Sequence, residues 1–438
     1  MTGVVAMSTY DSLLPPPFEA DVLVVGAGPA GSACAIAAAR AGLNVILADQ
    51  HAFPRDKVCG DGLIPDAHDA FRRLGVAAKV AARANAATHV GCVAPGGGRV
   101  DVPGRLAVLP RMILDEILRQ AAVDAGARWL PLARMERLVD DHYGGRVGGA
   151  KFRVGSKGHE YRRDIAARWT VLATGAVPQA LIAAGMCKRR TPSGIAMRGY
   201  VKNVAMTEAM KSLDVVWHRK LGRGYGWIFP CGHGVFNVGV GLSQSHTVKD
   251  DGREAMADDI NLRDVFDTFC QVHEPARRLV EGGEWLSALK GAPLRCSLEG
   301  AKLTRPGLLV TGEAAGSTYA FTGEGIGKAM ETGMLAAEAI LELSGLSELP
   351  LEARVPLDVD AQVRARYDMT VTALEPRFAL YERANRVNDR PWMIDLLIWR
   401  ARKNPRVLAR MAGVLEEKGN PGNLVSMRGM LRLFLPIR

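Results

Sequence analysis

The hydrophobic and polar positions near the start of the chain predict a strand, a helix and a second strand in close succession. Residues 21–25 (DVLVV) predict a short, mostly apolar strand, residues 32–41 are rich in alanine, and residues 43–48 predict a second strand ending at Asp49. The turn before the helix consists of Gly26, Ala27, Gly28, Pro29, Ala30 and Gly31. This order is a β-α-β unit, in which a G-x-G-x-x-G turn binds a dinucleotide and Asp49 is placed to accept from a ribose hydroxyl.

Each of the three glycines in the turn meets a different physical requirement. Gly26 permits the tight turn, Gly28 lets the backbone approach a pyrophosphate, and Gly31 lets the helix pack on the strand. The helix that begins at Pro29 and Ala30 would face the phosphates with its free backbone N–H groups, which Pro29 itself lacks, and with the positive end of its dipole. The turn therefore predicts a cofactor-binding site.

The pattern changes in the middle of the chain. Four segments joined by short turns lie between residues 195 and 242 and predict an antiparallel sheet: AMRGYV, LDVVWHR, GYGWIFP and VFNVGVGL. The flanking segments predict a helix at 111–126, a buried strand and turn at 169–175, a helix at 253–281 and a strand-turn-helix from 308 on; Gly96–Gly98 predict a hairpin tip. After Pro350 and Pro356 the chain has a helical pattern to its end.

We therefore predict an α/β fold: a Rossmann-like dinucleotide-binding domain with an inserted antiparallel β-sheet domain and a helical C-terminal segment. The dinucleotide-binding domain is expected to be discontinuous, over residues 20–75, 105–190 and 300–345. The expected substrate-binding domain comprises residues 76–104 and 191–299, and the helical segment 350–438. The second glycine-rich turn is not another G-x-G-x-x-G, which disfavours enzymes with separate FAD and NAD(P)H domains.

Composition is that of a globular protein, with 438 residues, 48% apolar and 23% charged. No apolar run reaches the roughly 20 residues of a membrane span. The first residues contain Pro15–Pro17 and no basic region, so we expect a leader other than a signal peptide and a cytoplasmic location. The seven cysteines include no C-x-x-C, which argues against a zinc knuckle, and we predict no metal site.

Most of the net charge of +10 lies near the C-terminus. From Arg377 onward, 13 Lys and Arg face 5 Asp and Glu, and the last twelve residues are basic and amphipathic. Such a segment is typical of peripheral contact with an anionic membrane, which deletion of residues 427–438 would test. A solvated surface, a helical cap over a substrate cavity and a dimer interface are the alternatives. No zinc-finger or RNP-type motif favours nucleic acid.

Four motifs together resemble the FAD-dependent geranylgeranyl reductase family, within the p-hydroxybenzoate hydroxylase-like flavoprotein group. They are GAGPAGSACAIAAARAG, FPRDKVCGDGL (53–63), YGWIFP (225–230) followed eight residues later by Gly239-Val240-Gly241, and TGEAAG…FTGEGIGKAMETGMLAAEAI (311–340). The resemblance covers roughly residues 20–345 and implies FAD as cofactor. It also implies reduction of isolated C=C bonds in long isoprenoid chains, with hydride from reduced FAD and a cavity beside the flavin.

The resemblance also implies further cofactor contacts. Cys59, Gly60 and Asp61 correspond to the family's C-G-D stretch near the isoalloxazine, and Cys59 is the candidate proton donor, with a small buried hydrophobe as the alternative. Glu313 replaces the aspartate that holds the ribityl chain, unless it is only a helix N-terminal acid. The remaining implied contacts are Arg55, Arg111, Gly175, Gly312, Gly316, Gly323, Gly325 and Ile326; Arg111 offers a bidentate fork to the cofactor or forms a structural ion pair.

Tyr225, Trp227 and Phe229 alternate along a strand and therefore point to one face. This aromatic face suits a polyprenyl chain, although aromatic strand faces are also common in cores. Pro230 is expected to end the strand, and Gly239 and Gly241 to leave room on the neighbouring strand.

The chain also departs from its relatives. The hydroxylase group has an Asp-Gly turn where this chain has Thr174-Gly175, so the electron donor is NAD(P)H or a separate reduced protein. The halogenase motifs G-E-S-L and W-x-W-x-I-P are replaced here, which disfavours halogenation.

Two alternatives to an isoprenoid reductase stay open. One is an FAD-dependent monooxygenase, a hydroxylase or epoxidase of an aromatic or terpenoid metabolite, and the other is a non-enzymatic flavin or lipid binder.

Overall fold

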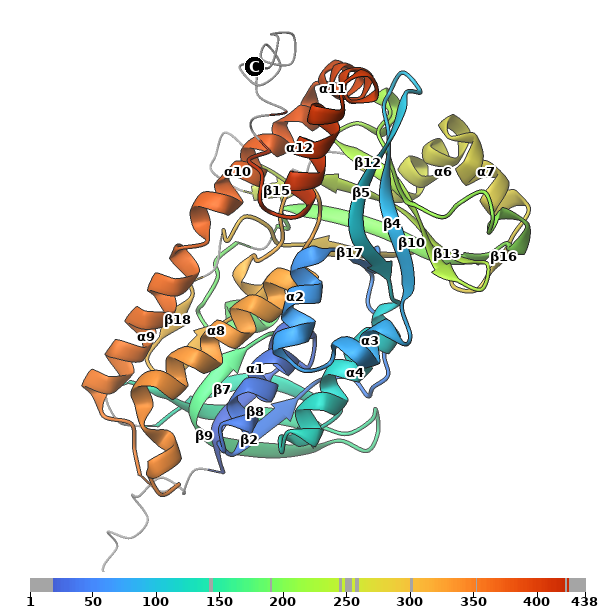
Figure 1. Ribbon diagram of the computed structural model, residues 1–438. Helices are drawn as coiled ribbons and strands as arrows, with labels where there is room; N and C mark the ends of the chain where they lie inside the picture. Colours follow the sequence, from blue (N-terminus) through green and yellow to red (C-terminus); the bar gives the residue numbers. More distant parts are fainter. Residues whose placement is uncertain are drawn as a thin grey trace, which may run out of the picture.

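Two sheets with helices packed around them make up the computed structural model (Figure 1). It describes residues 19–141, 145–189, 191–243, 246–248, 254–256, 260–299, 302–351, 353–421 and 424. The proline-containing leader and the basic residues 427–438 therefore lie outside the described residues.

The first sheet has the strand order β18-β19-β9-β1-β2-β6, with a hairpin of β7 and β8 attached to β9. Its strands are β1 (Ala20–Val25), β2 (Val45–Ala48), β6 (Arg128–Leu130), β7 (Ala133–Asp140), β8 (Val147–Val154), β9 (Tyr161–Leu172), β18 (Thr304–Arg305) and β19 (Leu308–Val310). β1 pairs in parallel with both β2 and β9, as expected of a β-α-β unit.

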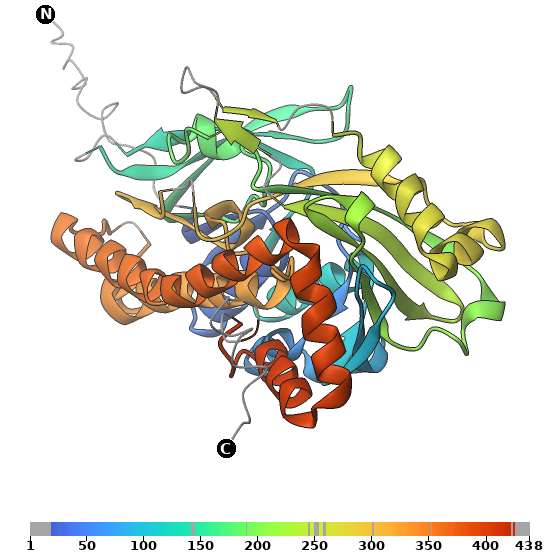
Figure 2. The ribbon, with the colours of Figure 1, turned by 90° about the horizontal axis from the view of Figure 1, so that it is seen from above.

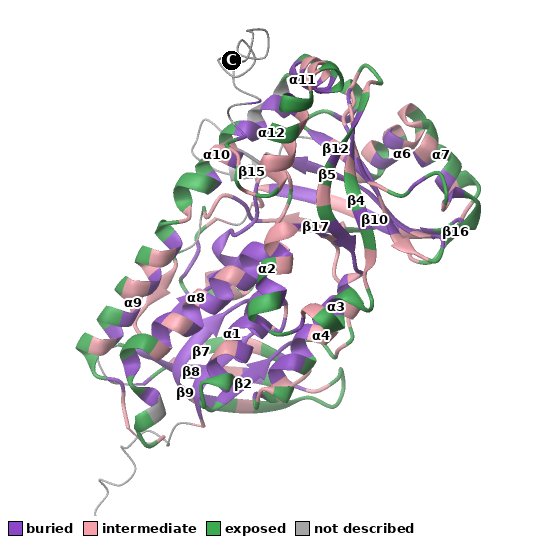
Figure 3. Cartoon of the chain, in the orientation of Figure 1, coloured by how far each residue is buried: buried purple, intermediate pink, exposed green. Residues whose placement is uncertain are grey.

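Every residue of β1 is buried, because its sheet is covered on both faces. Val22 and Val24 belong to a core shared with α1 (Pro29–Arg40), α4 (Arg111–Asp124) and α8 (Ile326–Ser344). Leu23 and Val25 point the other way, into a core shared with the β7–β8 hairpin. This two-sided burial explains why Val22–Val25 are all apolar, and Figure 3 shows α1, which covers one face of the sheet, coloured mostly as buried.

The second sheet has the order β16-β10-β13-β12-β11-β4-β5-β3, with β17 beside β10. The four segments predicted as antiparallel strands are β10 (Gly194–Lys202), β11 (Leu213–Val216), β12 (Gly224–Gly232) and β13 (Val235–Ser243). The remaining strands are β3 (Gly62–Leu63), β4 (Asn85–Val93), β5 (Arg99–Val108), β16 (Glu284–Trp285) and β17 (Lys290–Leu294). Gly96–Gly98 do form the tip of the β4–β5 hairpin, and β11 pairs with β4 in parallel, which the sequence did not indicate.

Two local predictions differ from the structure. The helical pattern expected over 253–281 is confirmed from Leu262 on, as two helices, α6 (Leu262–Val272) and α7 (Glu274–Glu281), but it is wrong for β15 (Glu254–Met256), a short strand that pairs with β14 (His246–Val248). Pro275 lies in the first turn of α7 and has no N–H to continue α6. Pro230 does not end its strand, because β12 runs on to Gly232 through a shift in register that accommodates the missing N–H.

Two proposed domain boundaries differ from the sheet limits. β3 belongs to the second sheet although it precedes residue 76, and β5 runs on to Val108, so a division at 104 cuts a strand. The short helices α2 (Pro65–Arg73) and α3 (Ala77–Ala81) follow β3, and α5 (Gln179–Ala183) follows β9. The chain thus passes between the two sheets several times, and the floor of a site between them is built from both.

The C-terminal helices extend along both sheets (Figures 1 and 2). They are α9 (Leu357–Thr372), α10 (Glu375–Asn385), α11 (Pro391–Lys403) and α12 (Pro405–Leu415). Residues of α9 join the core of the first sheet, whereas residues of α11 and α12 form a core with β4 and β5 of the second. Among the described residues, no helix is both long and apolar enough to cross a bilayer.

Candidate functional site

A cavity of about 1270 Å³ lies between the two sheets. At one end it begins at the turn after β1, and at the other it reaches apolar side chains of α11 and α12. The predicted residues that line it are Gly26, Gly28, Pro29, Ala30, Asp49, Arg55, Cys59, Gly60, Asp61, Arg111, Gly175, Tyr225, Trp227, Phe229, Gly241, Glu313, Gly323, Gly325 and Ile326. Segments that are distant in sequence therefore meet at one site.

The glycine-rich turn is shaped by close backbone packing. A Cβ on Gly26 would lie 2.3 Å from the carbonyl oxygen of Ala173, and one on Gly31 would lie 1.8 Å from that of Gly26. Gly28 differs, because a Cβ there would meet only Arg55 Nη2, at 3.6 Å. Gly28 is also the N-cap of α1, and no side chain caps this helix end. The free N–H groups and an open approach at Gly28 therefore fit a pyrophosphate.

Asp49 and Thr174 supply polar atoms at the same end of the cavity. Asp49 Oδ2 accepts from the N–H of Ala27 at 2.8 Å and Oδ1 from that of His51 at 2.9 Å. Burial raises the pKa of Asp49, but hydrogen bonds from His51 and Ala27 and the charge of Arg55 outweigh it and bring the pKa below its usual value. The buried hydroxyl of Thr174 has no hydrogen-bond partner among the described residues. An anionic acceptor and an orphaned hydroxyl fit the ribose and other polar groups of a dinucleotide.

Arg111 forms a structural ion pair, the alternative that the sequence left open beside a cofactor contact. Its Nε and Nη2 bind the two oxygens of Asp115 at 2.7 and 2.9 Å, and Arg55 Nη1 also lies 3.0 Å from Asp115. Burial lowers the pKa of Arg111, but Asp115 and the neighbouring Cys59 outweigh it, so its pKa lies above the usual range. The fork that was expected to hold the cofactor is therefore occupied by Asp115, although Arg111 still lines the cavity.

The Cys59–Asp61 loop is fixed to β10 and β13. Asp61, whose φ is +65°, accepts from Tyr200 Oη at 2.5 Å and from Asn237 Nδ2 at 2.7 Å. Burial raises the pKa of Asp61 to about 6, against the lowering effect of these hydrogen bonds. The N–H of Asp61 in turn lies 3.3 Å from Cys59 Sγ, and Asn237 Nδ2 also donates to the Cys59 carbonyl at 2.8 Å. This network holds the Cys59 thiol at the cavity wall.

Asn237 also connects this loop to the aromatic strand face. Its Oδ1 accepts from Trp227 Nε1 at 2.9 Å, while Gly60 packs against Phe229 so closely that a Cβ would lie 3.1 Å from the ring. The rings of Tyr225, Trp227 and Phe229 follow one another with centroids 6.3 and 6.4 Å apart. The predicted aromatic face therefore does line the cavity.

The two glycines on β13 have different surroundings. A Cβ on Gly239 would lie 2.4 Å from Trp227 and from the Met197 carbonyl, so Gly239 makes room for the indole and does not line the cavity. A Cβ on Gly241 would have Trp227 at 3.5 Å and would otherwise point into the cavity. Pro230 is also absent from the cavity wall, and its carbonyl accepts from Asn85 Nδ2.

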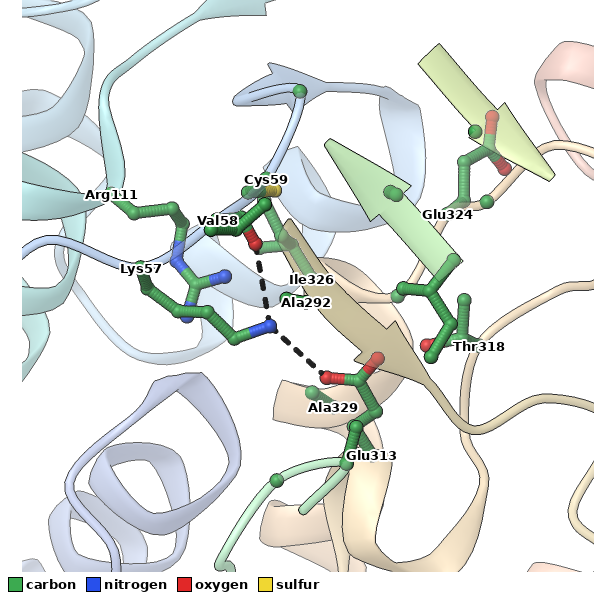
Figure 4. A pocket seen from close by; sticks show the side chains of 18 of the residues that line it. Lys57, Val58, Cys59, Arg111, Ala292, Glu313, Thr318, Glu324, Ile326 and Ala329 are labelled. Carbon is green, nitrogen blue, oxygen red and sulfur yellow. Dashed lines mark hydrogen bonds and ion pairs between the residues drawn. The ribbon is translucent and has the colours of Figure 1, made fainter. Parts of the chain in front are cut away.

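The residues of the fourth motif place the N-terminal end of α8 at the cavity wall. Gly325 is the N-cap of α8, again without a side-chain cap, and Gly323 has a φ of +70°. Glu313 forms an ion pair with Lys57, whose Nζ also donates to the Val58 carbonyl (Figure 4). Gly31, Gly312 and Gly316 lie behind the cavity wall, where Gly312 packs on Ala30. The uncapped helix end fits the electron-rich edge of a reduced flavin.

Two buried carboxyl groups near this helix end were not predicted from the sequence. Glu324 lines the cavity immediately before α8, on the opposite side of the view from Lys57 and Arg111 (Figure 4). Burial, together with the charges of Asp66 and Glu417, raises the pKa of Glu324 well above its usual value. Burial also raises the pKa of Asp66 to about 7, although Lys328 lowers it. Burial therefore favours the protonated form of both carboxyl groups.

We expect Asp66 to make stability fall as the pH rises. The folded chain keeps the Asp66 proton up to about pH 7, whereas the unfolded chain releases it near the usual value of 3.8. In this window, wild type should lose up to about 1.4 kcal/mol of unfolding free energy per pH unit relative to Asp66→Asn. Urea unfolding at several pH values measures the difference, and Asp69→Asn on the exposed side of α2 is the control. A difference that does not change with pH would contradict the assignment.

The apolar lining at the far end of the cavity was not predicted from the sequence. Val387, Ile394, Leu397 and Ile398 line it from the segment around α11, and Met411, Val414 and Leu415 line it from α12 and its end. Of the alternatives for the C-terminal segment, a helical cap over the cavity matches this arrangement. The helical pattern was visible in the sequence, but its packing partner was not.

Comparisons with known proteins agree with this geometry. Residues 19–254, more than half of the chain, match the model of the FAD binding domain family. A menaquinone reductase of Mycolicibacterium smegmatis is 34% identical over 333 residues, which cover 73% of this chain and 76% of that protein. A digeranylgeranylglycerophospholipid reductase of Methanopyrus kandleri is 29% identical over 335 residues, covering 74% and 77%.

Solved structures share the fold. A geranylgeranyl bacteriochlorophyll reductase-like protein from Thermoplasma acidophilum has a TM-score of 0.68 at 22% identity and covers 94% of this chain and 95% of its own. A flavin-dependent brominase has a TM-score of 0.67 at 18% identity, covering 94% and 97%. At these identities the likeness concerns the fold alone.

The fold, the uncapped helix ends and the matched domain define an FAD-dependent oxidoreductase. Within this class, the chain belongs to the geranylgeranyl reductase family of the p-hydroxybenzoate hydroxylase-like flavoproteins.

Proposed function

We propose that the protein reduces isolated C=C bonds in the isoprenoid chain of a lipid. The observation that carries this proposal is the single cavity that joins the cofactor end, the aromatic face of β12 and the apolar wall of α11 and α12. A long hydrocarbon chain fits such a space better than a compact aromatic metabolite does. The names of the relatives support it, because menaquinone and digeranylgeranylglycerophospholipid both contain an isoprenoid chain.

Bound reduced FAD would supply the hydride. The residues of this chain would position the alkene: Trp227 and Phe229 offer flat apolar surface, and Gly241 leaves space for the chain beside the indole. An isolated alkene has no carbonyl to polarise, so alignment must provide much of the rate enhancement. We assign the proton to the Cys59 thiol, since the Asp61 N–H and Asn237 hold its loop at the cavity wall.

We propose that electrons reach the flavin from NAD(P)H or from a separate reduced protein. The support for a separate protein is Thr174, which has no carboxylate to contact a nicotinamide cofactor. Starting the assay from chemically reduced enzyme makes the test of substrate class independent of this donor.

The test is mass spectrometry of products from the reduced enzyme and geranylgeranyl lipids, without oxygen and in air. We expect two hydrogens to be gained in the anaerobic sample, and Gly241→Val to lower kcat/KM at least about tenfold while it retains FAD. A short isoprenoid substrate is the internal control, because Gly241→Val should lower kcat/KM less for it than for a long chain. Oxygen incorporated only in air would mean a monooxygenase, and no product in either sample would reject prenyl substrates. Unchanged turnover in Cys59→Ala would assign the proton to water.

A further inference from the structure

Helix α11 exposes two tryptophans on one face. Trp392 and Trp399 are 47% and 43% exposed, and their spacing of seven residues places them on the same side of the helix, two turns apart. The opposite side is firmly packed, with Met393, Ile394, Leu397, Ile398 and Ala401 buried. Large aromatic side chains are among those that folding usually hides, so this exposed pair on a fixed helix needs an explanation.

Basic side chains follow the second tryptophan along α11 and α12. Arg400, Arg402 and Lys403 lie in the last turn of α11, and Lys403 Nζ lies 4.6 Å from the centre of the Trp399 ring. Arg406 and Arg410 follow on exposed positions of α12. Between residues 391 and 415 the only acid is Asp395, and its carboxylate accepts from the N–H of Gly96. The exposed residues Trp392, Trp399, Arg402, Lys403, Arg406 and Arg410 of the two helices are here called the α11 face, and four of these six side chains are cationic.

Helix α11 lies between the α11 face and the cavity. Ile394, Leu397 and Ile398, on the inner side of the same helix, line its apolar end. Figure 1 shows α11 at one extremity of the molecule, away from β2 and the other strands of the first sheet. One helix thus separates the cavity from the exposed tryptophans.

We propose that the α11 face docks on the surface of an anionic phospholipid bilayer. Indole rings partition to the level of the lipid headgroups, where the ring is apolar and the N–H remains hydrated. Arginine and lysine beside them complement the negative headgroups, and tryptophan with flanking cations is the pattern of a helix lying in the membrane interface. Docking here would bring the apolar end of the cavity close to the lipid phase. Docking is measured without turnover, so its outcome is independent of the proposed substrate.

The experiment is co-sedimentation of the FAD-loaded full chain with vesicles, followed by flavin absorbance. We expect binding to phosphatidylcholine vesicles that contain phosphatidylglycerol, weak binding to phosphatidylcholine alone, and a strong decrease on raising the salt concentration. Trp392→Ala with Trp399→Ala should lower the partition coefficient at least about tenfold. Arg402→Gln with Lys403→Gln and Arg410→Gln should lower it comparably on anionic vesicles only.

Matched controls separate the α11 face from general effects. Tyr161→Ala with Leu357→Ala removes two exposed apolar side chains elsewhere, and Lys157→Gln with Lys188→Gln removes two exposed cations elsewhere; neither pair should change binding. Retained flavin and an unchanged unfolding temperature verify the fold of each variant. Quenching of tryptophan fluorescence by brominated lipid should weaken in Trp399→Phe if this indole enters the interface.

Three outcomes would overturn the proposal. The first is the absence of binding to anionic vesicles. The second is equal binding by wild type and the double tryptophan variant, which would mean that the α11 face contacts a protein partner or solvent. The third is binding that disappears on deletion of residues 427–438 but survives loss of both tryptophans, which would assign docking to the tail alone.

Discussion

Replacing Gly28 with valine should weaken FAD binding at least about a hundredfold, or about 2.7 kcal/mol, without unfolding the apoprotein. The valine Cβ has room in the protein itself, since its first neighbour, Arg55 Nη2, lies 3.6 Å away. The added methyl groups would instead fill the space above the first turn of α1, where a pyrophosphate must approach the backbone. Titration of apoprotein with FAD, followed by flavin fluorescence, measures the effect.

Two further glycine variants make this result specific. Gly413→Ala in α12 places its Cβ in open space, 3.9 Å from the nearest atom, and should leave the FAD affinity unchanged. Gly31→Ala would force a Cβ to 1.8 Å from the Gly26 carbonyl oxygen and should destabilise the apoprotein itself. If Gly28→Val bound FAD as wild type does, the cofactor would not lie on this helix end.

Asp360→Ala should lower the free energy of unfolding by about 3–5 kcal/mol, because it leaves a buried guanidinium without its counter-charge. Asp360 Oδ1 accepts from Arg146 Nε at 2.8 Å and from the N–H of Gly307 at 2.7 Å, and Oδ2 accepts from Arg364 Nε at 2.6 Å. Arg146 is 1% exposed, and its burial lowers its pKa despite the neighbouring carboxylate.

Urea unfolding of the apoprotein gives the free energies for this comparison. Asp358→Asn is the matched control, because Asp358 is an exposed acid in the same first turn of α9. We expect a change below about 1 kcal/mol for the control. A similarly small change for Asp360→Ala would show that Arg146 finds water or another partner. Since the pair joins α9 to the first sheet, a large loss would show that the C-terminal segment contributes to global stability.

Local patterns predicted the parts of the fold that depend on neighbours in sequence. The β1-α1-β2 unit follows from an apolar run, three glycines and an alanine-rich helix, and all of these act within 30 residues. The four strands β10, β11, β12 and β13 of the second sheet were predicted for the same reason. The break between α6 and α7 was also visible, since Pro275 cannot continue a helix. So was the partner of Arg111, because Asp115 lies four residues later on one helix face.

Contacts between distant segments were not predictable in this way. Asn237 donates to Asp61 and accepts from Trp227, but its sequence context is only that of a polar residue on a strand. The raised pKa of Glu324 depends on burial and on Asp66, more than 250 residues earlier. The apolar wall from α11 depends on a packing arrangement that helical spacing does not specify. These parts of the site exist only once the whole chain has folded.

The order in which the ribosome makes the parts of the site matters for truncated chains. The residues that line the cofactor end of the cavity, here called the nucleotide cradle, are all synthesised before the end of α8, whereas α11 and α12, which line the apolar end, follow later. A chain truncated by a premature stop codon before residue 391 would retain the cradle residues and lack that wall. We therefore expect a nonsense mutation there to abolish turnover of long-chain substrates even in fragments that still bind FAD.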